Sequence, residues 1–200
     1  MKLIDHIHGD FVQGRRARVL AEYLVQLLPN GCRVLDVGCG DGLIDDLIVQ
    51  RRPDVVVKGI EPVLRGRAGA SIEQFDGGHI PFPSRSFDLV MLIDVLHHTE
   101  DPVAVLREAA RVAERAILVK DVLRDGFLVD TTLRFMDRVA NLRYGVPLPY
   151  TFWTRQRWDS SFDDLGLRVR SWEKVTGLYP WPATLLFERS MHFVTELTEG

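Results

Sequence analysis

The stretch from Val34 to Gly42, VLDVGCGDG, decides the fold of this chain. A run with the character of a buried strand leads directly into three alternate glycines, Gly38, Gly40 and Gly42. Glycines let the backbone turn sharply and approach a ligand at the carboxyl end of a strand, where open α/β sheets bind ligands. The stretch predicts a first strand followed by a ligand-binding loop, and a plain glycine turn is the alternative.

Two other glycine loops do not fit this stretch. A dinucleotide loop, G-x-G-x-x-G, needs its third glycine where this chain has Leu43. A Walker loop needs Lys followed by Ser or Thr after the glycines, and neither pair is present. The loop is therefore neither a dinucleotide fingerprint nor a P-loop.

Strand-like and helical segments alternate on both sides of this loop. Strand-like apolar runs and amphipathic patterns indicate an α/β fold with parallel strands and right-handed crossovers. The predicted strands are Arg33–Val37, Val55–Ile60, Ser71–Phe75, Phe87–Ile93 and Ala116–Lys120, and the predicted helices are Gly14–Leu28, Leu43–Arg51 and Pro102–Ala113.

The alternation stops after Asp121. A helix is predicted around Leu128–Asn141, followed by the loop-like stretch GVPLPYTFW and by strand-like runs at Leu167–Trp172 and about Leu185–Val194. We expect one domain over residues 1–200, with an N-terminal helical segment at 1–30 and an insertion on the substrate side at 121–160.

Composition excludes several classes of protein. The chain has 200 residues, 46% hydrophobic and 26% charged, with a net charge of −3, which is globular composition without a global attraction to nucleic acid. No segment approaches the roughly 20 apolar residues of a membrane span, and the N-terminus MKLIDHIHGD lacks the apolar run of a secretion signal. We expect a cytoplasmic protein with free thiols at Cys32 and Cys39, no nucleic-acid partner and no stable membrane insertion. The oligomeric state is open.

Acidic residues follow the next two predicted strands. Glu61, before Pro62, stands 19 positions after Gly42, where a carboxylate can accept hydrogen bonds from both ribose hydroxyls. Asp76, before Gly77, can accept from an adenine amino group. A surface acid and a turn-forming Asp-Gly are the alternatives, but agreement at three successive strand ends favours a nucleoside site.

With these residues in place, the chain resembles a known family. The segments VLDVGCGDG, GIEP, DGGHIPFPSRSFDLV, VLHHTEDP and LREAARV are similar to the successive motifs of class I S-adenosylmethionine-dependent methyltransferases, in particular the small-molecule group called type 11. The resemblance extends from Val34 to about Asp121. Two departures are Asp41, where Thr or Ser is common, and the missing glycine after Val112.

The resemblance implies a Rossmann-like, seven-stranded, mostly parallel sheet with helices on both faces, its last strand antiparallel, and a helical or loop insertion after strand five. It implies S-adenosyl-L-methionine as cofactor, with the glycine loop around the methionine part, Glu61 at the ribose and Asp76 with Gly77 at the adenine. Asp94 should lie beside the methionine part and the substrate. The full set of implied cofactor residues is Asp36, Gly38, Cys39, Gly40, Gly42, Glu61, Pro62, Asp76, Gly77 and Asp94.

Two adjacent histidines follow the fourth predicted strand. Histidine is the usual proton acceptor near neutral pH, and methyl transfer requires an aligned nucleophile and, for some acceptors, removal of a proton. We predict His98 as the base, then His97, with Asp94 beside them; satisfaction of backbone carbonyls is the alternative. His6 and His8 are too few for a metal site, and no metal is expected.

The insertion is expected to supply the acceptor pocket. It interleaves arginines with aromatic residues, which suits a closing cover with an anion contact. The candidate substrate residues are Arg134, Arg143, Tyr144 and Trp153; arginines paired with nearby Asp residues are the alternative.

These observations predict an enzyme, a methyltransferase acting on a small molecule. It would move a methyl group from S-adenosylmethionine to an oxygen, nitrogen or carbon by in-line displacement, with lipidic and anionic metabolites both open as acceptors. A non-catalytic nucleoside-binding or protein-interaction module of the same fold is the alternative.

Overall fold

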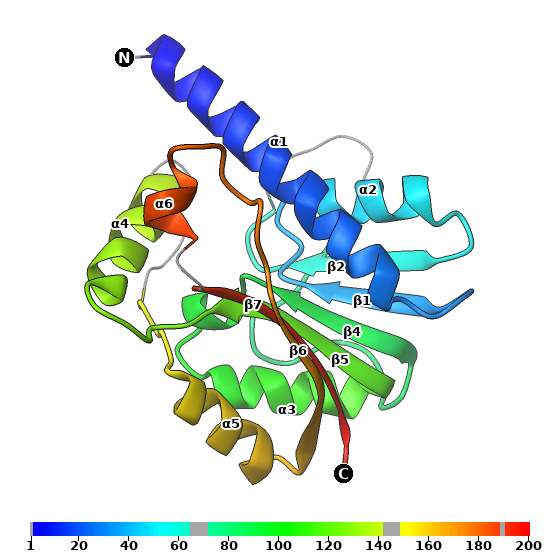
Figure 1. Ribbon diagram of the computed structural model, residues 1–200. Coiled ribbons are helices and arrows are strands. Elements are labelled where there is room, and N and C mark those ends of the chain that lie inside the picture. Colours follow the sequence, from blue (N-terminus) through cyan, green and yellow to red (C-terminus); the bar gives the residue numbers. More distant parts are fainter. Residues whose placement is uncertain (1, 65–71, 142–148, 189–190) are drawn as a thin grey trace.

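The computed structural model describes residues 2–64, 72–141, 149–188 and 191–200. Seven strands form one sheet in the order β3-β2-β1-β4-β5-β7-β6 (Figure 1). They are β1 (Arg33–Val37), β2 (Val56–Glu61), β3 (Ile72–Gln74), β4 (Phe87–Ile93), β5 (Ala113–Val122), β6 (Leu167–Lys174) and β7 (His192–Glu199).

The pairing confirms the predicted fold class. Strands β1 to β5 pair in parallel, and β7 pairs antiparallel with both β5 and β6. The last strand alone therefore runs against the others. Because β1 and β4 are neighbours although β2 and β3 lie on the other side of β1, the strand order reverses there, and ligands bind at such a switch point.

Helices cover both faces of the sheet (Figure 1). Alternate residues of β1 and β4 point into two separate cores: Leu35 and Val90 into one, Val34 and Met91 into the other. The first core is closed by α3 (Pro102–Val112) and α5 (Arg155–Asp164), and the second by α1 (Lys2–Leu27) and α2 (Leu43–Arg51). A short turn of 3-10 helix, η1 (Leu96–His98), and two helices, α4 (Val129–Asn141) and α6 (Thr184–Phe187), complete the fold.

Three elements differ from the sequence-based prediction. Helix α1 begins at Lys2, well before the predicted start at Gly14. Helix α5 was not predicted, although Thr154 caps it by accepting from the Arg157 N–H at 3.2 Å, and Trp158 and Phe162 share its buried face.

The predicted strand at 185–194 was wrong in its first half. Residues 184–187 form α6, and β7 starts only at His192. A short apolar run does not distinguish helix from strand, and here Leu185 and Leu186 are exposed instead of buried in the sheet.

Candidate functional site

A cavity of about 360 Å³ opens at the carboxyl ends of β1 and β4. The glycine loop forms one end of it, and η1 with α4 forms the other, while α1 lies along its side (Figure 1). Its lining is Gln13, Arg16, Ala17, Leu20, Asp36, Gly38, Cys39, Gly40, Asp41, Leu43, Ile44, Ile93, Asp94, His97, His98, Val122, Leu133, Met136, Asp137, Phe152 and His192.

The glycine loop has the backbone that only glycine adopts readily. Gly38, Gly40 and Gly42 have φ of 77°, 62° and 76°. The loop is fixed to the next strand by the Gly38 N–H, which donates to the Ile60 carbonyl at 2.8 Å. A Cβ added at Gly38 would lie 2.6 Å from Val95 Cγ2, so the loop has no room for a side chain there.

Glu61 is fixed against this loop. Its side chain is buried at the end of β2, and Oε2 accepts from the Gly40 N–H at 2.9 Å. Glu61 does not itself line the cavity, but it touches a residue that does. The spacing of 19 residues after Gly42 thus brought the predicted carboxylate to the glycine loop.

Asp76 and Gly77 lie at the end of β3, outside the cavity lining. The Asp76 carboxylate accepts from the Gly78 and His79 N–H groups at 2.8 Å each, and these bonds lower its pKa. A Cβ on Gly77 would be 3.4 Å from Pro62 Cγ, so Pro62 and Gly77 are neighbours.

Asp36 is buried and faces the cavity from the end of β1. Burial and the adjacent Asp45 of α2, with which it shares a hydrogen bond, raise the pKa of Asp36 well above its ordinary value. The Asp36 Oδ1 atom is buried and has no hydrogen-bond partner among the described residues, which suits a polar group of a ligand. Asp45 was not predicted.

Asp94 is held by two cations. It has a left-handed backbone, φ 57°, pairs with Lys120, and accepts from Arg16 Nη2 at 2.9 Å. Burial opposes the charge of Asp94, but Lys120 and Arg16 outweigh it and hold the pKa of Asp94 well below its ordinary value. Asp94 is thus an ionised anchor for the two cations and a poor proton acceptor.

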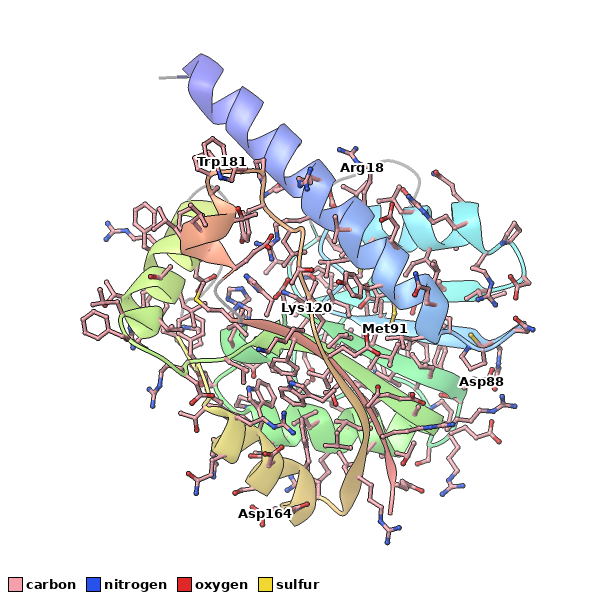
Figure 2. The ribbon with its side chains drawn as sticks, in the orientation of Figure 1. Arg18, Asp88, Met91, Lys120, Asp164 and Trp181 are labelled. Carbon is pink, nitrogen blue, oxygen red and sulfur yellow. The ribbon has the colours of Figure 1, made fainter. Side chains whose placement is uncertain are left out.

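Sequence reasoning missed both cations. Lys120 is fully buried in the interior of the molecule (Figure 2), and its position at the end of the fifth predicted strand was the available signal. Arg16 comes from α1, and its Nη1 also donates to the Tyr179 hydroxyl at 2.7 Å. Helix α1 is therefore attached to the site by the ion pair between Arg16 and Asp94, which are far apart in sequence.

His97 forms a buried pair with Asp121. The His97 Nδ1 and Asp121 Oδ1 atoms are 2.6 Å apart, and the ring leaves its Nε2 edge for other contacts. Burial lowers the pKa of His97, but the Asp121 carboxylate reverses this and raises it overall. Asp121 at the end of β5 was not predicted as a site residue.

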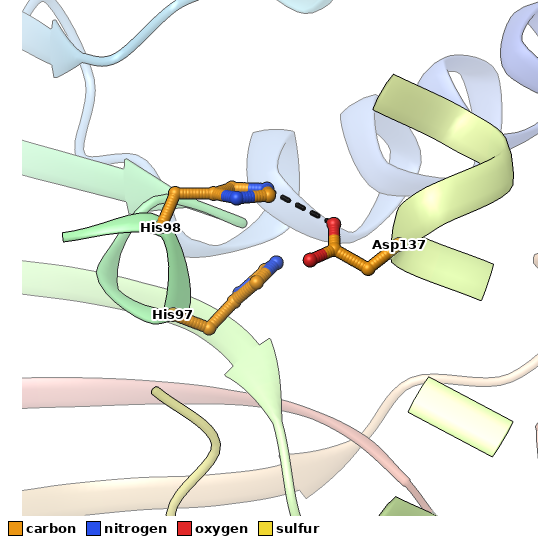
Figure 3. A group of neighbouring side chains, drawn as sticks. All are labelled: His97, His98 and Asp137. Atoms are coloured by element: carbon orange, nitrogen blue, oxygen red, sulfur yellow. Dashed lines mark ion pairs between the residues drawn. The ribbon is translucent and has the colours of Figure 1, made fainter. Parts of the chain in front are cut away.

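The imidazole of His98 packs against the imidazole of His97. The centroids of the two imidazoles are 4.1 Å apart, and His98 Nε2 is 3.4 Å from Asp137 Oδ1 on α4 (Figure 3). All three side chains line the cavity. The predicted histidines thus meet a carboxylate that the sequence did not reveal as their neighbour.

The predicted substrate residues do not line this cavity where the structure describes them. Arg134 is exposed and pairs with Asp130 at 2.8 Å, and Trp153 packs edge-on against Trp158 at 4.7 Å. Arg143 and Tyr144 lie outside the described residues. The face of α4 that reaches the cavity carries Leu133, Met136 and Asp137, because positions three and four apart share one side of a helix.

The length and hydropathy of the helices bear on whether the chain crosses a membrane. Among the described residues, no helix combines the length and the apolar character that crossing a membrane requires.

Comparison with protein families gives a match over most of the chain. A family model described as a methyltransferase domain matches residues 11–172. Among curated proteins, the chain is 35% identical over 108 residues to 27-O-demethylrifamycin SV methyltransferase of Amycolatopsis mediterranei, covering 46% of this chain and 39% of that protein. It is 32% identical over 126 residues to the ubiquinone biosynthesis O-methyltransferase of Hahella chejuensis, covering 56% and 46%. These matches span less than half the length of the relatives.

Solved structures share the fold. The putative methyltransferase in a complex with the Haloferax volcanii Trm112 methyltransferase activator has a TM-score of 0.68 at 16% identity, covering 98% of this chain and 96% of that one. A SAM-dependent methyltransferase from Aquifex aeolicus has a TM-score of 0.61 at 17% identity, covering 90% and 89%. At these identities the likeness concerns the fold.

Proposed function

Because the chain belongs to the methyltransferase domain family, with the fold and cofactor of class I S-adenosylmethionine-dependent methyltransferases, we propose that it methylates a small molecule held in this cavity. The acceptor atom we favour is a hydroxyl oxygen, since named relatives include O-methyltransferases. Nitrogen and carbon acceptors remain alternatives that the assay below separates.

The observation that supports this proposal best is the division of the cavity into two ends. One end is backbone and carboxylate, from the glycine loop and Asp36, and the other is imidazole and carboxylate, from His97, His98 and Asp137. The lining also contains five apolar side chains, which are those of Leu20, Val122, Leu133, Met136 and Phe152. Such a cavity suits an acceptor with an apolar body, so we favour lipidic over anionic metabolites.

The residues at the loop end fit the family's cofactor. Gly38, Gly40 and Gly42 give the loop a left-handed backbone without side chains, Asp36 presents a buried oxygen without a hydrogen-bond partner among the described residues, and Glu61 fixes the loop through the Gly40 N–H. We propose that Glu61 and Pro62 hold the ribose, that Asp76 and Gly77 hold the adenine, and that Asp36, Cys39 and the loop hold the methionine part. When bound, S-adenosylmethionine supplies a methyl group on a positively charged sulfur.

The chain's own side chains exclude water, take part in removing the acceptor's proton and align the acceptor. Asp94 holds Lys120 and Arg16 beside the cavity, and the apolar side chains of the lining exclude water from the reacting atoms. The acceptor loses its proton at the histidine cluster, where His98 and then His97 are the predicted groups. Alignment of the acceptor oxygen is the main contribution that such a rigid cavity makes.

We also propose a cytoplasmic location. Cys32 and Cys39 are free thiols, and thiols stay reduced in that compartment.

The test is transfer of an isotopic label. The full chain is incubated with methyl-labelled S-adenosylmethionine and a small-molecule extract, and labelled products are identified by mass spectrometry. The matched control is Gly40→Val, which places a branched side chain in the loop. A product that forms with the wild type and not with the control supports the proposal. Cofactor binding without any labelled product would favour the alternative, a non-catalytic nucleoside-binding module.

A further inference from the structure

We infer that His97, His98 and Asp137 form a binding site for a divalent transition-metal ion of the zinc type. Each side chain offers one ligand atom, and these atoms all lie within 4.8 Å of one another. Figure 3 shows both imidazole rings directed at the carboxylate, with η1 supplying the two histidines and α4 supplying the aspartate.

The spacing matches the coordination distances of zinc. Nitrogen and oxygen ligands about 2.0–2.2 Å from a tetrahedral ion are roughly 3.4 Å from each other. His98 Nε2 and Asp137 Oδ1 are already 3.4 Å apart. The remaining separations do not exceed 4.8 Å, so side-chain movements of about 1 Å bring all three atoms to the required distance.

A second observation is the way in which His97 is held. Ligating histidines almost always give their other ring nitrogen to a carboxylate, which fixes the ring and its tautomer. Asp121 does this for His97: Oδ1 is 2.6 Å from Nδ1, and the carboxylate is fully buried and also accepts from the Val122 N–H at 2.7 Å. Because Nδ1 of His97 is held by Asp121, Nε2 is the ring nitrogen that is left to bind the ion.

The nearby group of Asp94, His97 and Asp121 is a weaker candidate. Its acidic members already have partners, because Asp94 is paired with Lys120 and Arg16, and Asp121 with His97. Two imidazoles and one carboxylate also suit zinc and its neighbours better than magnesium or calcium, which prefer oxygen ligands. We therefore assign the ion to His97, His98 and Asp137.

Three protein ligands leave one coordination position open, as in catalytic zinc sites, and all three side chains line the cavity. This part of the inference rests on the proposed function: an acceptor hydroxyl reaching that position would have its pKa lowered and would lose its proton to bulk solvent before the cavity closes around the reacting atoms. The two histidines would then act on the acceptor as ligands of the ion. Metal binding itself does not depend on methyl transfer.

The sequence did not suggest this site. His97 and His98 are adjacent, but Asp137 is far along the chain, inside the segment that follows the fifth strand. The earlier expectation of no metal considered His6 and His8, which are a different pair.

The experiment is a metal titration of the full chain after treatment with a chelator. Zinc binding is measured by competition with a chromophoric chelator, and cobalt(II) is added separately to record the visible spectrum of a tetrahedral site. We expect one ion per chain. His98→Ala and Asp137→Asn should each weaken zinc binding about 100-fold or more, and Asp121→Asn about 10- to 100-fold. Circular dichroism checks that each variant is folded.

The matched control is His79→Ala. His79 is exposed and pairs with Glu108 at 2.8 Å, so it is a histidine beside a carboxylate outside the cavity. Its variant should bind zinc as the wild type does. Zinc binding that is absent in the wild type, or unchanged in a folded His98→Ala variant, would overturn the metal site. In that case, methyl transfer that persists in chelator would leave the proposed function standing, with the histidines as direct proton acceptors. Zinc binding without methyl transfer would retain the site and remove the proposed function.

Discussion

The two ends of the cavity are built in different ways. The glycine-loop end comes from one continuous segment between β1 and α2, with Glu61 added from the neighbouring strand. The histidine end is assembled from α1, η1, β5 and α4, which are separated along the chain and meet through side-chain contacts such as Arg16 with Asp94 and His98 with Asp137.

The two ends should differ in how they respond to substitution. The backbone of the loop end tolerates few changes, because its three glycines have left-handed conformations and Gly38 has no space for a Cβ. The histidine end depends on contacts between single side chains, such as His98 with Asp137, and each contact is lost when one partner is replaced.

The largest effect should come from the loop. In Gly38→Ala, the added Cβ would lie 2.6 Å from Val95 Cγ2 at a φ of 77°, so the loop must shift. We expect the affinity for S-adenosylhomocysteine, measured by calorimetry, to fall about 100-fold or more.

Gly31→Ala is its control. Gly31 also has positive φ, 65°, but a Cβ there meets nothing within 4 Å. It should lose about 1 kcal/mol of stability and keep full affinity. Equal affinities for the two variants would show that the loop does not hold the cofactor.

The next effect concerns the charge of Glu61. Glu61→Gln keeps an oxygen that can accept from the Gly40 N–H but removes the negative charge, whereas Glu61→Ala removes both. We expect roughly 10-fold weaker binding of S-adenosylhomocysteine for Gln and up to about 150-fold for Ala. Glu73→Gln, on the exposed part of β3, is the control and should bind normally. A Glu61→Ala variant with wild-type affinity would refute the ribose assignment.

A third prediction uses the carboxyl pair behind the loop. Burial raises the pKa of Asp45 to about 6, so the Asp45 carboxyl holds its proton more tightly in the folded chain than in the unfolded chain. The stabilisation from this proton is complete below about pH 4 and is lost as the pH rises through 6.

Asp45→Asn cannot lose such a proton. Its stability relative to the wild type should therefore increase between pH 4 and pH 7, by about 1–3 kcal/mol in urea denaturation. Asp164→Asn, at the exposed end of α5, should show no such change. A constant difference across this range would mean that Asp45 titrates normally.

The smallest effect is expected at the other end, where one of two cations is removed. Arg16→Met deletes the bonds to Asp94 and Tyr179, but Lys120 still pairs with Asp94. We expect a loss of about 1–2 kcal/mol in the free energy of unfolding. Arg18→Met, on the exposed side of α1 (Figure 2), should stay within about 0.5 kcal/mol of the wild type. Equal losses would show that the Arg16 contacts add nothing to stability.

The same contrast explains what could be predicted from sequence. The strand, glycine loop and helix at 33–51 were predicted within a residue because all their signals are local. Glu61, at the end of the neighbouring strand, was predicted from its distance in sequence to the glycine loop, and its side chain contacts Gly40 in the structure. The seven-stranded, mostly parallel sheet with an antiparallel last strand followed from the family resemblance and is confirmed by the pairing.

The histidine end could be predicted only in part. His97 and His98 were found because they follow a strand, but their partners Asp121 and Asp137 depend on how β5 and α4 pack. Arg134 was favoured for its charge, yet its helix turns that side chain toward Asp130. Composition shows which residues a segment has, and it does not show which face of the helix meets the cavity.

The most direct test of this account is amide hydrogen exchange of the full chain with and without S-adenosylhomocysteine. If the glycine loop and the following strand ends hold the cofactor, exchange should slow at residues 38–43, 61–63 and 76–79, and less at 133–137 of α4. Unchanged exchange at 38–43 with saturating ligand, or slowing confined to α4, would contradict the assignment of the two ends.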